Sequence, residues 1–337
     1  MARDFLQLKG LTKTWPGSHG VQALDLSVAE GEFVALLGPS GCGKSTTLRL
    51  IAGLETADQG RIMLRGADVT TTPAAERGLS MVFQSYALFP HLNLRENILF
   101  GLKVRKLPKS EREARLAEAL EITGLKGLER RRPGEISGGQ RQRVALARAI
   151  VSKHALCLMD EPLSNLDAKL RHSVRRDIKR MAQDLGMTVI YVTHDQTEAM
   201  SMADQVVLMR DGRIEQQGSP EALYARPETL FSAGFIGAPP MARIPGAALG
   251  PAGSPDRIYG LRAEYLALTE GPGQLRAEVL DCEYLGSETL INLTAPGCEG
   301  LSLRRTGRCL MPPGVPVNLG FDPAQLHVFD AHTGRRL

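Results

Sequence analysis

The sequence predicts an α/β fold built on a parallel sheet with an inserted helical subdomain, followed by a small domain made only of strands. Three observations support this prediction. A glycine-rich loop at Gly38–Thr46 joins an apolar strand to a helix, further apolar strands alternate with helices up to about residue 236, and short segments of alternating polarity fill residues 237–337. We therefore expect two domains, at 1–236 and 237–337, with the helical subdomain at about 88–152.

The glycine-rich loop fits the pattern G-x-x-x-x-G-K-[ST] of a phosphate-binding loop. In this pattern backbone N–H groups surround the phosphates, the lysine reaches the β- and γ-phosphates, and the hydroxyl holds magnesium. Residues 32–37 predict a buried strand and residues 46–52 a helix that ends at Gly53, so the helix N-terminus points at the phosphates. The predicted nucleotide-binding residues are Gly38, Pro39, Ser40, Gly41, Cys42, Gly43, Lys44, Ser45 and Thr46.

A second buried strand, predicted at 155–159, ends in the carboxylates Asp160 and Glu161. We expect Asp160 to face magnesium through water, because that ion keeps part of its hydration shell. Glu161 is then placed to polarise an attacking water. Asp-Glu pairs are also common on solvated loops, so this pair indicates a nucleotide site only together with the phosphate-binding loop.

A second glycine-rich turn, Ser137-Gly138-Gly139-Gln140, opens a helix predicted over Gln140–Val151. With Ile136 before it, the turn resembles the signature Leu-Ser-Gly-Gly-Gln of the ATP-binding cassette (ABC) ATPases, a family of P-loop NTPases. Further matches to this family occur in the right order over residues 5–235, at Trp15, Gln84, Ser164-Asn165-Leu166-Asp167 and His194.

The resemblance implies that Gln84 senses magnesium and the dimer interface, that His194 contacts the γ-phosphate, and that Trp15 stacks on adenine. Taken one at a time, these residues have other interpretations. Gln84 would be a surface glutamine and His194 a hydrogen-bonded core histidine. Trp15 would anchor a loop, and the family more often has tyrosine at its position.

The resemblance also implies that the signature turn of one subunit closes over ATP held by the phosphate-binding loop of another. ATP and Mg²⁺ are then the cofactors, and the partner is a second ABC subunit, expected to be an identical copy. In the closed dimer the signature turn complements γ-phosphate charge, Glu161 orients the water, and Lys44 and magnesium take up charge. The implied catalytic residues are Lys44, Gln84, Glu161 and His194, the magnesium-binding residues are Ser45, Gln84 and Asp160, and the further nucleotide-binding residues are Trp15, Ser137, Gly138, Gly139, Gln140 and Asp167.

Composition predicts a soluble protein with one large and one small core, since 43% of the 337 residues are hydrophobic and 23% are charged. A net charge of +4 is too mild to name a partner. The arginines at 130–132, 141–148 and 171–180 are interpreted as solvated or interface faces of helices, so no nucleic acid is expected. No signal peptide or membrane helix is predicted.

Five cysteines, Cys42, Cys157, Cys282, Cys298 and Cys309, show no metal-ligand spacing, and disulfides are not expected. Cys42 differs from the others because it lies inside the phosphate-binding loop at a helix N-terminus. That environment predicts a lowered thiol pKa, and alkylation of Cys42 is expected to block ATP binding.

Within the helical subdomain, residues 110–122 predict a surface helix opened by a Ser110 cap, with Glu113 three residues later. Residues 237–255 contain nine glycines and prolines, a linker composition. Strands are expected at 276–280, 288–293 and 315–319. Three segments, 260–266, 284–289 and 321–330, resemble the small OB-like (TOBE-type) domain appended to ATPases of bacterial carbohydrate importers. Ala263 and Tyr265 depart from its usual proline and histidine, and the segment 241–260 looks short for its first strands.

The resemblance implies the ATP-hydrolysing, energy-coupling subunit of a bacterial importer for a carbohydrate or sn-glycerol 3-phosphate. Such a subunit lies peripherally on the cytoplasmic face of the inner membrane. It binds two transmembrane permease subunits, with Tyr86, Leu88 and Phe89 as candidate contacts, and serves an extracytoplasmic solute-binding protein. The alternatives are import of a polyamine or inorganic ion, a soluble ABC ATPase acting on the ribosome or DNA, and a binding module at 237–337 that docks a regulatory protein or senses an anion.

Overall fold

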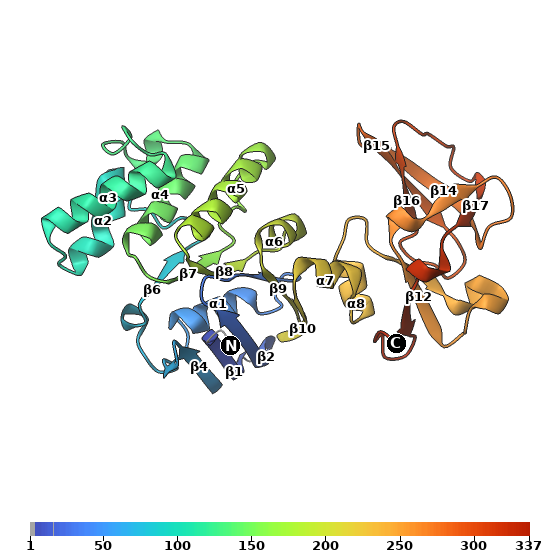
Figure 1. Cartoon of the computed structure of the whole chain (residues 1–337), viewed down its shortest axis with the longest axis horizontal. Helices are drawn as coiled ribbons and strands as arrows, with labels where there is room; N and C mark the ends of the chain where they lie inside the picture. Colours follow the sequence, from blue (N-terminus) through green and yellow to red (C-terminus); the bar gives the residue numbers. More distant parts are fainter. Residues whose placement is uncertain (1–3, 16) are drawn as a thin grey trace. The chain divides into compact units, whose positions relative to one another are not determined.

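The computed structural model describes residues 4–15 and 17–337, which fall into two compact units divided between Pro220 and Glu221 (Figure 1). Helix α7, at Pro220–Ala225, begins at the division, and α8, at Leu230–Phe235, belongs to the second unit. The domain boundary predicted at 236/237 follows these two helices and stays a prediction.

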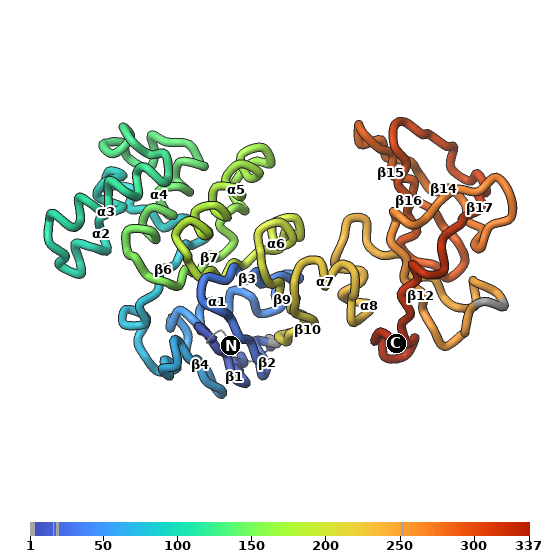
Figure 2. Tube along the Cα trace, viewed as in Figure 1, coloured from blue at the N-terminus to red at the C-terminus, as the bar shows by residue number. Residues whose placement is uncertain are grey.

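The first unit is organised around a six-stranded sheet with the order β10-β9-β3-β8-β7-β6, in which only β10 is antiparallel to its neighbour. Strands far apart in the sequence pair here, as β3 and β9 do (Figure 2). The strands are β3 Phe33–Leu37, β6 Leu79–Val82, β7 Leu156–Asp160, β8 Thr188–Val192, β9 Gln205–Arg210 and β10 Arg213–Gly218. Strands β3 and β8 are buried along their whole length and show no alternation of buried and exposed positions, as is typical of parallel strands. The parallel sheet predicted from such segments is confirmed.

A second, antiparallel sheet in this unit has the order β2-β1-β4-β5. Its strands are β1 Asp4–Trp15, β2 Ser18–Ala29, β4 Gln59–Leu64 and β5 Ala67–Asp68. Leu6, Leu8 and Ile62 from this sheet share one core with Leu48 and Ile51 of α1, which spans Lys44–Ala52. The core therefore holds α1 in place, with Lys44 as its first residue.

The predicted helical subdomain is confirmed, and Figure 1 shows its three main helices grouped together. They are α2 Leu94–Val104, α3 Lys109–Thr123 and α4 Gly138–Val151, and their facing apolar side chains form a separate core. The predicted Ser110 cap is wrong. The residue before α3 is Pro108, whose side chain has no hydrogen-bond acceptor and so cannot cap the helix, while Ser110 already lies within its first turn. Glu113 pairs with Arg95 instead. The remaining helices of this unit are α5 Ala168–Asp184, α6 Gln196–Met202 and the 3₁₀ turns η1 Ala74–Glu76 and η2 Pro133–Glu135.

The second unit carries two antiparallel sheets, which confirms the predicted all-β domain. The first, with order β11-β12-β18, comprises β11 Ala242–Pro245, β12 Arg257–Leu261 and β18 His327–Asp330. The second, with order β13-β17-β14-β15-β16, comprises β13 Ala267–Thr269, β14 Leu275–Tyr284, β15 Glu288–Thr294, β16 Ser302–Thr306 and β17 Pro316–Gly320. The 3₁₀ turns are η3 Gly246–Ala252, η4 Ala263–Tyr265 and η5 Pro323–Gln325.

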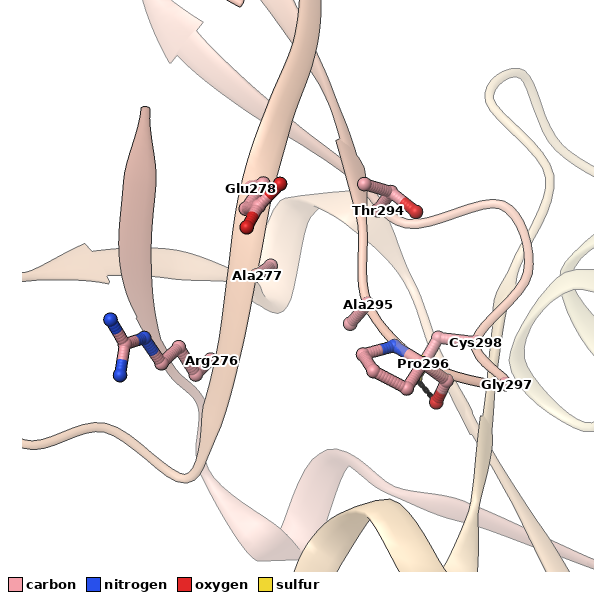
Figure 3. A pocket seen from close by; sticks show the side chains of 8 residues that line it. All are labelled: Arg276, Ala277, Glu278, Thr294, Ala295, Pro296, Gly297 and Cys298. Carbon is pink, nitrogen blue, oxygen red and sulfur yellow. Dashed lines mark hydrogen bonds between the residues drawn. The ribbon is translucent and has the colours of Figure 1, made fainter. Parts of the chain in front are cut away.

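The linker prediction for 237–255 is wrong in part. Ala242 and Ile244, on β11, are fully buried in the core of the β domain, because glycine and proline in this stretch form turns around a short strand. A hollow of about 730 Å³ lies between β14 and residues 294–298 (Figure 3). In the part of the chain that the structure describes, we find no helix with the length and apolar character needed to span a membrane.

Candidate active site

The phosphate-binding loop connects β3 to α1 and depends on glycines. Gly38, Gly41 and Gly43 have φ values of 152°, 80° and 103°, a region that L side chains rarely adopt. A Cβ on Gly38 would also lie 2.3 Å from the carbonyl oxygen of Met209. The loop can therefore turn its backbone N–H groups toward an anion at the N-terminus of α1.

Lys44 is folded back into this loop. Its Nζ donates hydrogen bonds of 2.8 Å to the carbonyl oxygens of both Gly38 and Pro39, and it lies 3.7 Å from Sγ of Cys42. The side chain is buried. A buried ammonium that bonds only neutral acceptors would gain from an anionic one, so the loop fits a phosphate group.

Ser45 and Asp160, which are 115 residues apart, meet at the end of the sheet. Oγ of Ser45 donates a 2.8 Å hydrogen bond to Oδ1 of Asp160. A hydroxyl and a carboxylate are hard oxygen donors of the kind that Mg²⁺ prefers, with phosphate and water as its other ligands. Among residues 4–15 and 17–337 no cluster of three or more His, Cys, Asp or Glu could hold a metal ion.

Glu161 and His194 follow the neighbouring strands β7 and β8, and their side chains meet. Oε2 of Glu161 lies 3.2 Å from Nδ1 of His194. The Glu161 backbone has a φ of 43° and its N–H donates to the carbonyl oxygen of Val192, which attaches it to β8. His194 remains 59% exposed at its side chain, so it can reach a ligand above the sheet edge.

Gln84 joins this group through the loop after β7. Its Nε2 donates to Oγ of Ser164 at 3.3 Å, and Ser164 in turn donates to the carbonyl oxygen of Glu161 at 2.9 Å. Asn165 donates to the carbonyl oxygen of Gln84 at 2.9 Å. The structure thus forms two direct pairs at one sheet edge, Ser45 with Asp160 and Glu161 with His194. Lys44 precedes Ser45 in the loop, and Gln84 reaches the group through Ser164.

The signature turn forms the start of α4. Oγ of Ser137 accepts from the N–H of Gln140, and the Gln140 side chain accepts from the N–H of Ser137, a reciprocal capping box. Within the described residues, no hydrogen bond or ion pair joins the turn to the phosphate-binding loop of the same chain. Its contribution to nucleotide binding stays a prediction.

Asp167 has a local role that can be seen directly. Its side chain caps α5 by accepting a 2.9 Å hydrogen bond from the N–H of Leu170. Trp15 lies at the end of β1, is 37% exposed, and has Nζ of Lys13 5.6 Å from its ring centroid. The exposed ring is compatible with adenine stacking, which stays a prediction.

The expectation for the Cys42 thiol is wrong in direction. The side chain is only 4% exposed, and burial raises its pKa above the ordinary value, although Lys44 opposes the shift. Desolvation of the thiolate therefore outweighs the neighbouring ammonium and the helix N-terminus.

Sequence reasoning missed the residues that hold the segment around His194. Glu198, only 4% exposed, accepts hydrogen bonds from the hydroxyls of Tyr191 and Thr193 at 2.9 and 2.7 Å. Burial and the neighbouring Glu198 raise the pKa of Tyr191 well above its ordinary value. The spacing Asp195-x-x-Glu198 at a helix start is the available signal, but it predicts a capping box rather than a buried carboxylate.

Comparison with known proteins agrees with this geometry. The ABC transporter family matches residues 21–164, and the TOBE domain family matches residues 259–329. The chain is 45% identical to the sulfoquinovosyl glycerol transport ATP-binding protein of Agrobacterium fabrum, over 98% of this chain and 99% of that protein. It is 44% identical to the sn-glycerol-3-phosphate import ATP-binding protein of Cereibacter sphaeroides, with the same coverage. A solved dimeric ATP-binding cassette in a post-hydrolysis state, bound to ADP and phosphate, is similar with a TM-score of 0.56 and 30% identity, over 64% of this chain and 98% of that one.

Proposed function

The chain belongs to the family of ABC transporter ATP-binding subunits and is an ATPase, and we propose that it powers import of a carbohydrate or of sn-glycerol 3-phosphate. The observation that carries the proposal is the extent of similarity. Two relatives match this chain along nearly their whole length. The name of one states transport of sulfoquinovosyl glycerol and that of the other states import of sn-glycerol 3-phosphate, and the matched length includes the β domain. A polyamine or an inorganic ion is the alternative cargo.

The paired residues at the sheet edge support specific roles in hydrolysis. Lys44 would exchange its bonds to loop carbonyls for the β- and γ-phosphates, and Ser45 and Asp160 would hold Mg²⁺ together with Gln84. When bound, magnesium neutralises charge on the phosphates. Glu161 would accept a hydrogen bond from the attacking water and orient it, while His194 would donate to the γ-phosphate.

The N-terminus of α4 supports a dimeric arrangement. Ser137, Gly138 and Gly139 present a helix start suited to an anion, yet no bond connects them to the phosphate-binding loop of the same chain among the described residues. Two copies would bring each signature turn over the other's nucleotide. Closure would exclude water and strengthen the hydrogen bonds to the γ-phosphate.

A hollow next to Phe89 supports a surface for the membrane subunits. This hollow of about 300 Å³ is lined by Phe100, Arg105 and Arg148 among others. The ring centroids of Phe89 and Phe100 lie 4.5 Å apart. Leu88 and Phe89 are partly buried there, whereas Tyr86 is 8% exposed and serves mainly as core. Two permease subunits at the cytoplasmic face of the membrane, and a solute-binding protein outside, complete the proposed importer.

The test is a pull-down of the tagged full chain from detergent-solubilised native membranes, with co-purifying proteins identified by mass spectrometry. Two polytopic membrane proteins and a secreted binding protein would support the importer. Ribosomal or DNA-associated proteins alone would contradict it. An untagged strain carried through the same steps is the control.

The cargo needs a separate measurement. Solutes are first screened for those that raise the thermal unfolding midpoint of the recovered binding protein. Each of these is then added to the reconstituted complex, and the rate of ATP hydrolysis is measured. Stimulation of ATP hydrolysis by a sugar, by sulfoquinovosyl glycerol or by sn-glycerol 3-phosphate supports the proposal. Stimulation only by a polyamine or an inorganic ion assigns the cargo to the alternative.

A further inference from the structure

The first turn of α5 connects two parts of the site that are far apart in sequence. The loop Ser164–Asp167, which we call the α5 entry loop, leads into this turn, and Arg171 lies one helical turn beyond Asp167. Arg171 donates from Nη2 to the carbonyl oxygen of Leu166 at 3.1 Å. This hydrogen bond ties the guanidinium to the backbone of the entry loop.

The same guanidinium faces the start of α6, which Figure 1 shows beside α5. Its Nη1 lies 3.6 Å from Oδ2 of Asp195, and its Nε lies 4.0 Å from Oε1 of Glu198. The Arg171 Nε is buried and has no hydrogen-bond partner among the residues that the structure describes. An unsatisfied buried N–H beside a buried carboxylate is stabilised by any shift that shortens their separation.

Asp195 and Glu198 in turn fix both neighbours of His194. The N–H of Asp195 donates to Oγ1 of Thr193 at 3.0 Å, and Glu198 accepts from the same hydroxyl at 2.7 Å. The N–H of Thr193 donates to the carbonyl oxygen of Leu36, at the end of β3. The backbone that carries His194 is thus anchored to the acidic pair that Arg171 faces.

The entry loop and α5 also touch the signature turn of their own chain. A Cβ on Gly138 would lie 3.4 Å from the Leu166 side chain, and a Cβ on Gly139 would lie 2.8 Å from that of Leu170. The signature turn and the entry loop therefore pack on the same turn of α5 from which Arg171 projects. A displacement of either one is transmitted to that turn, because packed side chains leave little room to give way.

We propose that Arg171 is a positioning residue that couples the α5 entry loop to His194, acting through Asp195 and Glu198. The proposal rests on the proposed ATPase dimer, in which the signature turn faces the partner's nucleotide and the entry loop packs on that turn through Leu166. Closure of the dimer would move the entry loop, and Arg171 would carry that displacement to the segment that holds His194. Arg171 touches neither the phosphate-binding loop nor the reacting atoms, so it is not a catalytic residue.

The test compares steady-state ATP hydrolysis and ATP binding in full-length variants. Arg171→Ala should lower kcat about 10- to 100-fold, the scale of a small misplacement in a catalytic site, while the Kd of the subunit for ATP changes less than about twofold. Arg171→Lys should recover part of kcat, because an ammonium reaches one acceptor but cannot bridge several. Arg180→Ala is the matched control, since Arg180 lies on the same helix, is 69% exposed and pairs with Asp177.

Non-additivity separates coupling from a general loss of stability. Glu198→Gln should lower kcat about as much as Arg171→Ala, and the double variant should fall no further, because both changes break one connection. ATP-dependent dimerisation of Glu161→Gln should persist when Arg171→Ala is added, since binding is intact and only chemistry is affected.

Three results would overturn the inference: kcat of Arg171→Ala equal to that of Arg180→Ala, kcat and ATP affinity falling together with the unfolding temperature, or fully additive losses in the double variant. If Arg171→Ala does not fold, Arg171→Lys and Glu198→Gln decide by the same criteria. A wild-type chain that binds ATP without hydrolysing it, alone or with its membrane partners, would contradict the proposed function instead.

Discussion

Oε2 of Glu161 lies 3.2 Å from Nδ1 of His194, and the two residues follow the adjacent parallel strands β7 and β8. The carboxyl ends of parallel strands meet at one edge of a sheet, so the pairing of β7 with β8 brings these two residues together. It places a carboxylate that can orient water next to an imidazole that can donate to phosphate.

Glu161→Gln should abolish most ATP hydrolysis and preserve ATP binding. The amide keeps the size of the side chain but cannot act on water as the carboxylate does, and a loss of about 10²- to 10⁴-fold in kcat is expected for a lost general base. The variant should accumulate as a dimer with ATP, seen by gel filtration. Glu118→Gln, at an exposed pair with Lys153, should behave as wild type. Monomers alone in the presence of ATP would contradict the prediction.

Lys44→Ala should weaken ATP binding itself. The ammonium now bonds two loop carbonyls at 2.8 Å, and no other charge in the loop can replace it on the phosphates. We expect at least about tenfold weaker binding by calorimetry, in line with the loss of a charged hydrogen bond of about 1.5–3 kcal/mol. Lys103→Ala on the exposed face of α2 is the control. Unchanged affinity in Lys44→Ala would show that the loop binds nucleotide without this charge.

Cys42 should react slowly with maleimide at neutral pH. Burial raises the pKa of its thiol, so a smaller fraction is thiolate at pH 7 than for a free cysteine. The labelling rate should therefore still be rising with pH above the ordinary pKa of a cysteine thiol. ATP should protect it, and modification should abolish ATP binding because the adduct would fill the loop. Cys42→Ser should be resistant to this inactivation. Fast labelling at pH 7 with full retained activity would refute both parts.

Arg262→Ala should destabilise the second unit. Arg262 is 2% exposed and donates to the carbonyl oxygens of Ala233, Ile236 and Tyr224, near the ends of α7 and α8. Its guanidinium also lies 4.1 Å from the Tyr224 ring centroid. Removing it strands buried carbonyls, for which a loss of about 2–4 kcal/mol is typical.

Hydrogen exchange can measure this loss locally. Amides of residues 224–262 should exchange faster in Arg262→Ala, while those of β3 and β7 keep their rates. Arg257→Ala, at an exposed position of the same strand β12, should leave both regions unchanged. Equal exchange in the two variants would mean that Arg262 does not hold α7 and α8.

By itself, the sequence determined the features that follow from local pattern. The phosphate-binding loop, the buried strands and the helical subdomain could be predicted because glycine placement and apolar periodicity act over a few residues. Resemblance then supplied Gln84, Trp15, His194 and the signature turn, whose residue types carry little information one at a time.

Only the tertiary structure decided what depends on burial and on contacts across the chain. It reversed the expected pKa direction of Cys42, because desolvation depends on what packs over the thiol. It placed Ala242 and Ile244 in a core although their segment has a linker composition. It also turned Arg171, from a series of arginines expected on a solvated face, toward Leu166, Asp195 and Glu198. The direction of a side chain in a charged helix depends on the elements beside it, and that information is not local.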